Sequence, residues 1–217
     1  MVLKGPTFIV MDYYPRSLHN YIQFNVTPFT INFIQNIMRQ LLSALAALHE
    51  RRVIHRDIKS INILCTGDAR QIALADFGIS REFCIPFRTY TKEVATIDHR
   101  AIELLLGCKA YTTAIDIWAV GCVFIHLCEG KCFGSSLDNG TTETGFILEI
   151  FRVFGTPNTE PYFTKLPSWQ PGFPNYPPAN LAEVFPKMAQ YPHAIDFLSV
   201  RSHFGFGYQR TANNLLI

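Results

Sequence analysis

The side chains best suited to chemistry lie between residues 55 and 76. Asp57 follows a histidine and an arginine, Lys59 lies two residues further on, and Asn62 lies five residues after the aspartate. Asp57 can accept a proton from a hydroxyl group, and Lys59 can neutralise negative charge that develops on a transferred group. A carboxylate and a cation at this spacing on one loop are suited to moving an anionic group onto a hydroxyl.

Asn62 and Asp76 flank a predicted β-hairpin. Two short apolar runs, 63–65 and 72–74, are separated by a Thr-Gly-Asp turn, which is typical of a hairpin. Because a hairpin returns the chain to its start, Asn62 and Asp76 should be neighbours in space. An amide oxygen and a carboxylate are hard ligands suited to Mg²⁺, which prefers few protein ligands and a substrate phosphate. Each residue alone could be a surface charge or a loop cap, but together they predict a magnesium and phosphate site.

Helical periodicity dominates the rest of the chain. Between Thr30 and Glu50 the apolar residues recur on one face of a helix, and Thr30 is suited to the N-cap. Residues 113–129 are apolar nearly all round, which predicts a helix buried on all sides and closed by Gly130. Nine of the 13 prolines lie between residues 157 and 192, which predicts loops and short turns. The other predicted elements are a strand at 8–11, a helix at 142–154 ending at Gly155, and a helix at 194–200.

Composition limits the class of protein. The 217 residues are 48% hydrophobic and 17% charged, with a mean hydropathy of +0.12, which is too apolar for a disordered chain. A net charge of +2 without a basic stripe argues against a nucleic-acid partner. The best membrane candidate, 114–128, is too short and contains Asp116 and His126. Residues 1–15 lack the features of a signal peptide, so we expect neither a membrane span nor secretion.

The cysteines are scattered without C-x-x-C spacing, so neither a zinc site nor a disulfide framework is expected. We expect buried free thiols instead. The six cysteines are Cys65, Cys84, Cys108, Cys122, Cys128 and Cys132.

Several motifs of the sequence resemble those of a known family. His-Arg-Asp-Ile-Lys-Ser-Ile-Asn at 55–62 resembles the catalytic loop of the protein kinases, and Asp-Phe-Gly at 76–78 resembles their metal-binding triplet. The resemblance extends from about Phe8 to Arg210. Four further segments are similar to the cyclin-dependent kinases in particular: 86–94, 106–109, Asp116-Ile117-Trp118 and Gly155-Thr156-Pro157. In segment 86–94 the mitogen-activated kinases carry an acidic residue between a threonine and a tyrosine. Here Thr89 is followed directly by Tyr90 and Thr91.

The resemblance implies an α+β, mainly helical fold, the large C-terminal lobe of a protein kinase with its hinge strand. It implies ATP with Mg²⁺ as phosphate donor and a protein serine or threonine, followed by proline, as acceptor. Asp57 would be the catalytic base, acting with Lys59 and Thr96, while Asn62 and Asp76 would bind Mg²⁺. The ATP-binding residues, which match the strand connecting the lobes and the floor of the nucleotide pocket, would be Met11, Asp12, Tyr14 and Leu64.

The resemblance also implies a regulatory site and a substrate pocket. Thr91 matches the activating phosphorylation site; the alternative is a simple exposed threonine. A phosphate adds about −2 charge and three acceptor oxygens, and Arg56 and Arg81 occupy two positions of the family's arginine cluster that binds it. Val94 and Arg100 match positions that shape the pocket for the proline after the phosphoacceptor.

Three charged residues match structural positions of the family. Asp116 would hold the catalytic-loop backbone from the buried helix, and Glu103 would form a buried ion pair with Arg210. Elsewhere the chain departs from the family pattern: Asp98-His99 replaces Trp-Tyr, and Ile102 and Ser60 each replace a proline.

The phosphate-cradling G-x-G-x-x-G loop is absent from the 217 residues, since Gly5 is the only glycine before Gly67. The lysine and the cyclin-contacting helix of the small lobe have no counterpart either. We therefore predict one partial kinase domain, with residues 1–16 as the end of the small lobe and the hinge, and 17–217 as the large lobe.

Two functions follow. One is a serine/threonine kinase of cyclin-dependent type, truncated in this chain, with a cyclin-like activator as a further partner. The other is a catalytically inactive, kinase-like module that binds or scaffolds other proteins. Either could act in the cytoplasm, the nucleus or both.

Overall fold

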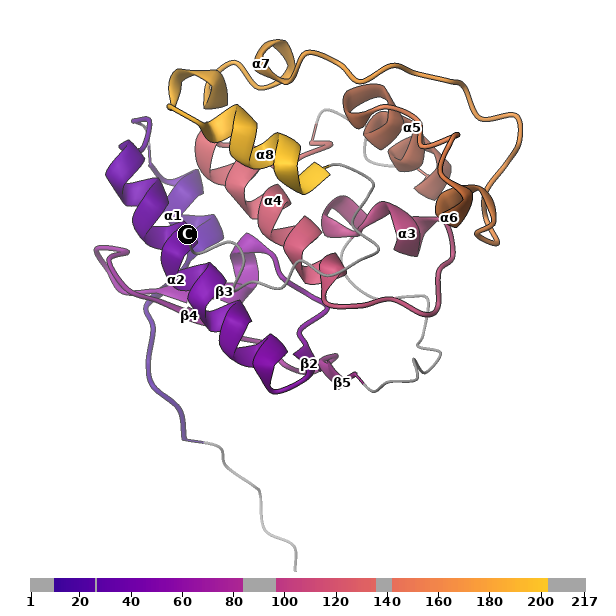
Figure 1. Ribbon diagram of the computed structural model, residues 1–217. Coiled ribbons are helices and arrows are strands. Elements are labelled where there is room, and N and C mark those ends of the chain that lie inside the picture. Colours follow the sequence, from indigo (N-terminus) through magenta and orange to yellow (C-terminus); the bar gives the residue numbers. More distant parts are fainter. Residues whose placement is uncertain (1–9, 26, 84–96, 136–141, 203–217) are drawn as a thin grey trace, which may run out of the picture.

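Helix α4 (Ala114–Glu129) lies at the centre of the fold. The computed structural model describes residues 10–25, 27–83, 97–135 and 142–202, with side chains described as far as Ser199. Nearly every residue of α4 is buried, because its sequence is apolar on all sides. Helices α2 (Ile31–Glu50) and α8 (Ala194–Ser202) both pack against it, and Figure 1 shows α4 running through the middle of the helical body. The predicted buried helix and the amphipathic helix before it are thus confirmed.

The long helices begin and end where the sequence predicts. Thr30 caps α2 by accepting a hydrogen bond from the Phe33 amide at 3.3 Å, and Thr142 caps α5 (Glu143–Phe154) in the same way through the Gly145 amide. Gly130 ends α4 with a φ of 75°, a left-handed conformation that glycine adopts without steric cost. Side-chain caps and a glycine stop therefore define these elements locally.

The predicted hairpin is confirmed and is part of a larger sheet. Strands β3 (Ile63–Cys65) and β4 (Ile72–Leu74) pair antiparallel, with Ile63 opposite Leu74. Strand β1 (Arg16–Ser17) adds to the other edge of β3. A second antiparallel pair joins β2 (Val53–Ile54) to β5 (Arg81–Glu82). The expectation of a single hairpin was therefore incomplete, because two-residue strands carry no alternating pattern that could be read from sequence.

Helix α1 (Leu18–Gln23) was not predicted from the sequence. Ser17 caps it through the Asn20 amide, and Leu18 and Ile22 are buried. Of the strand expected at 8–11, residues 8 and 9 lie outside the described part, and Val10 and Met11 form no strand. The short elements are η1 (Ser60–Asn62), η2 (Ile97–His99), α3 (Ile102–Leu105), α6 (Pro161–Thr164), α7 (Leu181–Val184) and η3 (Met188–Gln190).

Among the residues that the structure describes, no helix is both long and apolar enough to cross a membrane. The same residues contain no group of three or more histidines, cysteines or carboxylates placed to hold a metal. Every cysteine in the described ranges is a free thiol, as expected; Cys84 lies outside them.

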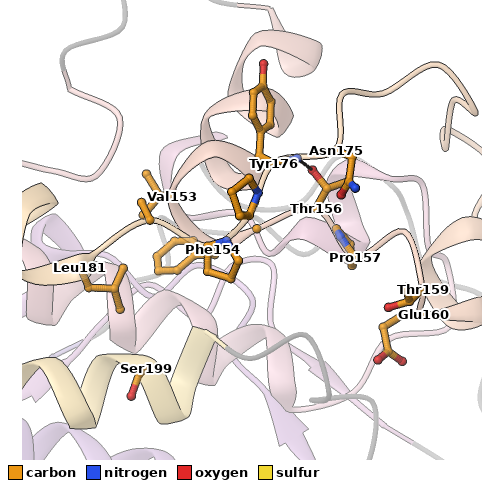
Figure 2. Close-up of a pocket in the computed structure, with 14 residues that line it drawn as sticks. Val153, Phe154, Thr156, Pro157, Thr159, Glu160, Asn175, Tyr176, Leu181 and Ser199 are labelled. Carbon is orange, nitrogen blue, oxygen red and sulfur yellow. Dashed lines mark hydrogen bonds between the residues drawn. The ribbon is translucent and has the colours of Figure 1, made fainter.

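The turn after α5 lines an open cavity of about 540 Å³. Figure 2 shows Val153, Phe154 and Leu181 around it, with Ser199 contributed by α8. Gly155 sits in this turn at a φ of 91°, and a Cβ there would lie only 3.1 Å from the Pro178 side chain. The cavity is lined by the proline-rich segment and does not include the residues of the hairpin or the loop before it.

We expect Gly155→Ala to destabilise the fold by about 1–3 kcal/mol, because alanine would be strained at this φ and would press on Pro178. The measurement is urea unfolding of the variant beside Gly67→Ala, a matched control at which an added Cβ meets nothing within 4 Å. Equal stability of the two variants would contradict this account of the turn.

Candidate active site

The loop between β2 and β3 brings two of the predicted site residues, Lys59 and Asn62, against a third, Asp57. The Lys59 ammonium lies 2.9 Å from Asp57 Oδ2. The Asn62 amide nitrogen donates to the same oxygen and to the Asp57 carbonyl, each at 2.9 Å. Asp57 Oδ1 is buried and, within the described residues, has no hydrogen-bond partner. Leaving a buried carboxylate oxygen unsatisfied is costly, so this atom is marked out as an acceptor for an incoming donor.

The hairpin brings Asp76 to the same end of the sheet as Asn62. The Ala75 amide donates to the Asn62 carbonyl at 2.8 Å, which extends the β3–β4 register by one step beyond Ile63 and Leu74. Asp76 has a φ of 64°, a left-handed conformation that is uncommon for residues other than glycine. Its carboxylate is exposed, and Oδ1 accepts from the Gly78 amide at 3.3 Å.

Asp116 of α4 fixes the beginning of the loop. Its two carboxylate oxygens accept hydrogen bonds from the backbone amides of His55 and Arg56, each at 2.9 Å. His49, at the end of α2, lies 2.9 Å from Oδ2. The side chain is completely buried, and these hydrogen bonds offset the cost of burying its charge. Arg56 has a φ of 71°, so the carboxylate holds an otherwise unfavourable backbone turn.

His55 connects the loop to the segment that follows β4. Its Nε2 lies 3.1 Å from the Ala75 carbonyl, and its ring meets the Phe77 ring edge-on at 4.9 Å. The His55 carbonyl accepts from the Ser80 hydroxyl at 3.1 Å. Burial lowers the pKa of His55, although the nearby Asp116 carboxylate acts against this. A neutral, fully hydrogen-bonded histidine here supports the two site segments and is not placed to exchange protons with a substrate.

Arg56 and Arg81, the predicted phosphate-binding pair, differ in their surroundings. Arg56 is buried; its Nε donates to the Ile79 carbonyl at 2.5 Å and its Nη1 to the Tyr111 hydroxyl at 2.8 Å. Arg81 is exposed in β5 and donates to the carbonyl of the residue before it. Thr91 lies outside the described residues. Nothing in the sequence pattern identified Tyr111 as a partner of Arg56, because the two are 55 residues apart.

The predicted ATP-binding residues differ in their exposure. Leu64 lies half-buried in β3, whereas Met11 is 79% exposed and Asp12 is also exposed. Met11, Asp12 and Tyr14 lie in the segment before β1, and Figure 1 shows this segment leading away from the helical body. An adenine site formed from this segment therefore stays a prediction.

Of the two predicted substrate-pocket residues, Arg100 is described and Val94 lies outside the described part, as does Thr96, the third predicted catalytic residue. Arg100 Nη1 lies 2.5 Å from Glu143 Oε1, at the start of α5. Burial raises the pKa of Glu103 to about 7. Its predicted partner, Arg210, lies in the part of the chain that the structure does not describe.

The substituted positions of the loop before α3 have their own contacts. Asp98 Oδ1 lies 3.0 Å from His99 Nδ1. Burial alone would raise the pKa of Asp98, but the hydrogen bond and charge of His99, a backbone hydrogen bond and the charge of Lys59 together hold this pKa below its usual value. Ile102, in place of the family's proline, is buried at the start of α3.

Residues 3–190 match the family model described as the protein kinase domain. Over 199 residues the chain is 38% identical to "Cell division control protein 2 homolog 3" of Trypanosoma brucei brucei. This chain thus belongs to the protein kinase family. Within it, the chain is similar to the cyclin-dependent type. The alignment covers 90% of this chain but only 62% of that relative, so the chain spans less than two thirds of its length.

Proposed function

We propose that this chain provides the catalytic loop of a serine/threonine kinase that transfers the γ-phosphoryl group of ATP to a protein. The single observation that carries the proposal is the arrangement around Asp57. One of its carboxylate oxygens is held by Lys59 and Asn62, while the other is buried without a partner among the described residues. This is the arrangement expected of a base that accepts the proton of a serine or threonine hydroxyl.

Lys59 and Asp57 would divide the work of the transfer. As the hydroxyl oxygen bonds to phosphorus, its proton passes to Asp57 Oδ1 and the bond to the β-phosphate oxygen of ATP breaks. The Lys59 ammonium, fixed 2.9 Å from the other oxygen of Asp57, is placed to neutralise charge on the transferred group. Thr96 would complete this set by bonding to the aspartate and the lysine.

Asn62 and Asp76 fit a Mg²⁺ ion. The Asn62 amide nitrogen is committed to Asp57, which leaves its amide oxygen for a cation. Asp76 adds an exposed carboxylate at the same end of the hairpin. Both are the hard oxygen ligands that Mg²⁺ prefers, and the bound ion would supply neutralisation of the phosphate charge.

The finer features of a cyclin-dependent kinase complete the proposal. Met11, Asp12, Tyr14 and Leu64 would bind ATP, and Val94 and Arg100 would select a proline after the phosphoacceptor. Residues 1–16 would join a small lobe and 17–217 form the large lobe, with a cyclin-like protein as activator and the cytoplasm or nucleus as location.

Phosphorylation of Thr91 would require a rearrangement at Arg56. The guanidinium group is held by the Ile79 carbonyl and the Tyr111 hydroxyl, so binding a phosphate through its terminal nitrogens would compete with the tyrosine contact. Arg81 is exposed and could turn toward a phosphate without losing a buried partner.

A kinase-like binding module is the second candidate function. It is favoured by Asp98 and His99, which pair with each other where the family has two aromatic residues. A module of this kind would keep the fold of the large lobe without binding nucleotide.

Binding of Mg-ATP distinguishes the two functions. We expect millimolar Mg-ATP to raise the melting temperature of the longest natural form of the protein, since a ligand at 100 times its Kd stabilises by about 2.7 kcal/mol. The increase should disappear with EDTA and shrink in Asp76→Asn, and it should persist in Asp68→Asn, a control in the exposed hairpin turn. An unchanged melting temperature with Mg-ATP would favour the binding module.

A further inference from the structure

His126 of α4 lies directly against the catalytic loop. Its Nδ1 is 2.9 Å from the Ser60 hydroxyl, and both side chains are buried, at 3% and 2% exposure. Cys132 Sγ lies 3.5 Å from the same nitrogen, and the His19 ring of α1 lies 5.5 Å away at 57°. The imidazole therefore touches the loop, the neighbouring helix and the segment after its own helix at once.

Ser60 is placed between two residues that act on Asp57. It begins η1, directly after Lys59, and the same turn ends at Asn62. The backbone amide of Asn62 donates to the Lys59 carbonyl at 2.9 Å, which closes the turn. Because the side chains of Lys59 and Asn62 both bind one oxygen of Asp57, a shift of η1 would displace them together.

The two ends of the loop are held by different residues of α4. Asp116 binds the amides of His55 and Arg56, at the beginning of the loop. His126 is ten residues further along the helix, about 15 Å at 1.5 Å per residue. It contacts the loop at Ser60, close to its end. One rigid, buried helix thus sets the position of both ends.

His126 is neutral at physiological pH. Burial, the largest cause, acts together with the neighbouring His19 and His99 to lower its pKa to about 4, and Asp98 acts in the opposite direction. A neutral imidazole can accept a hydrogen bond at Nδ1, so the Ser60 hydroxyl can donate to it without placing a charge beneath the site.

We propose that His126 is a positioning residue of the phosphoryl transfer, acting through Ser60 to align Lys59 and Asn62 on Asp57. The inference rests on the proposed kinase activity. The cyclin-dependent kinases resembled by this chain have a proline at the position of Ser60, and proline restricts the backbone by its ring. In this chain a hydrogen bond from the core provides the restraint that the ring would give.

The test compares kinetic variants in the longest natural form of the protein. Ser60→Ala and His126→Leu are each expected to lower kcat roughly 10- to 100-fold, with KM for ATP and peptide within twofold, since a displacement of about 1 Å can cost that much. The double variant should be no slower than either single variant, because both remove the same hydrogen bond. His126→Asn, whose amide can take the place of Nδ1, should recover most of the rate.

Ser60→Pro provides a matched background. Where the ring restrains the backbone, adding His126→Leu should leave kcat unchanged within twofold. Two results would overturn the proposal. One is a loss of kcat in Ser60→Ala/His126→Leu that equals the product of the two single losses. The other is a loss of kcat on adding His126→Leu to Ser60→Pro that is as large as the loss on adding it to the wild type. Melting temperatures of all variants separate a local effect from unfolding.

Amide hydrogen exchange tests the positioning without any activity. Ser60→Ala should speed exchange of the backbone amide of Asn62 more than tenfold. The backbone amides of His55 and Arg56, which donate to Asp116, should exchange at the wild-type rate. If the wild-type protein transfers no phosphate but shows this pattern, the proposed function fails and the positioning by His126 stands. An unchanged Asn62 amide would overturn the positioning, whatever the activity.

Discussion

We expect Asp57→Asn to lower the proposed phosphoryl transfer by about 10²–10⁴-fold, the usual contribution of a general base. Asparagine has nearly the same shape but cannot take up the proton of a hydroxyl group. Its amide can still meet Asn62 or Lys59, whose atoms lie 2.9 Å from Asp57 Oδ2, so the loop should stay folded. The measurement is kcat with γ-labelled ATP, and the Kd for Mg-ATP should remain within about threefold of wild type.

The control for this variant is Asp196→Asn, which makes the same chemical change at a largely exposed position of α8. It should leave kcat unchanged. A rate in Asp57→Asn within threefold of wild type would mean that another group is the base or that a contaminating kinase carries the activity.

Asp116→Ala is expected to have the largest effect on stability. The change removes the acceptor for two buried backbone amides, those of His55 and Arg56, and for His49. Each buried donor left without a partner costs about 1–3 kcal/mol, so the two amides together predict a loss of about 2–6 kcal/mol. Urea unfolding, with Asp196→Ala as the exposed counterpart, measures this loss.

Asp116→Asn should fall between wild type and alanine. An amide keeps one acceptor oxygen but turns an N–H₂ group toward the second backbone donor. A loss below about 1 kcal/mol in Asp116→Ala would contradict the conclusion that this carboxylate fixes the loop.

The parts of the fold that could be predicted from sequence are those with a continuous local signal. Helices α2 and α5 have apolar periodicity over many residues, and α4 is a long run that is apolar on all sides; each also has a capping threonine or a closing glycine. The β3–β4 hairpin has two apolar runs around a short polar turn. In each case the interaction that defines the element lies within a few residues of it.

The parts that were missed depend on contacts between distant residues. Strands β2 and β5 have two residues each, which is too short for any alternating pattern. The Ser60–His126 hydrogen bond joins residues 66 positions apart in the sequence, and neither residue type predicts that the other is its partner. A serine in a loop and a histidine in an apolar helix each have an ordinary explanation when taken alone.

The candidate site divides in the same way. Placing Asn62 and Asp76 at one end of the hairpin followed from strand pairing alone, and the structure places both residues there. That Asn62 would use its amide nitrogen to hold Asp57 could not be read from their spacing. Side-chain direction depends on η1, a turn that leaves no periodic signal in the sequence.

The most direct measurement is transfer of labelled γ-phosphate from ATP to peptides that differ only in a serine, threonine or tyrosine acceptor and in the residue that follows it. For the longest natural form of the protein, the proposed function predicts Mg²⁺-dependent labelling of serine and threonine, strongest before proline and lost in Asp57→Asn. An absence of labelling by protein that is folded and saturated with Mg-ATP would contradict the assignment of Asp57 as the base of a working kinase.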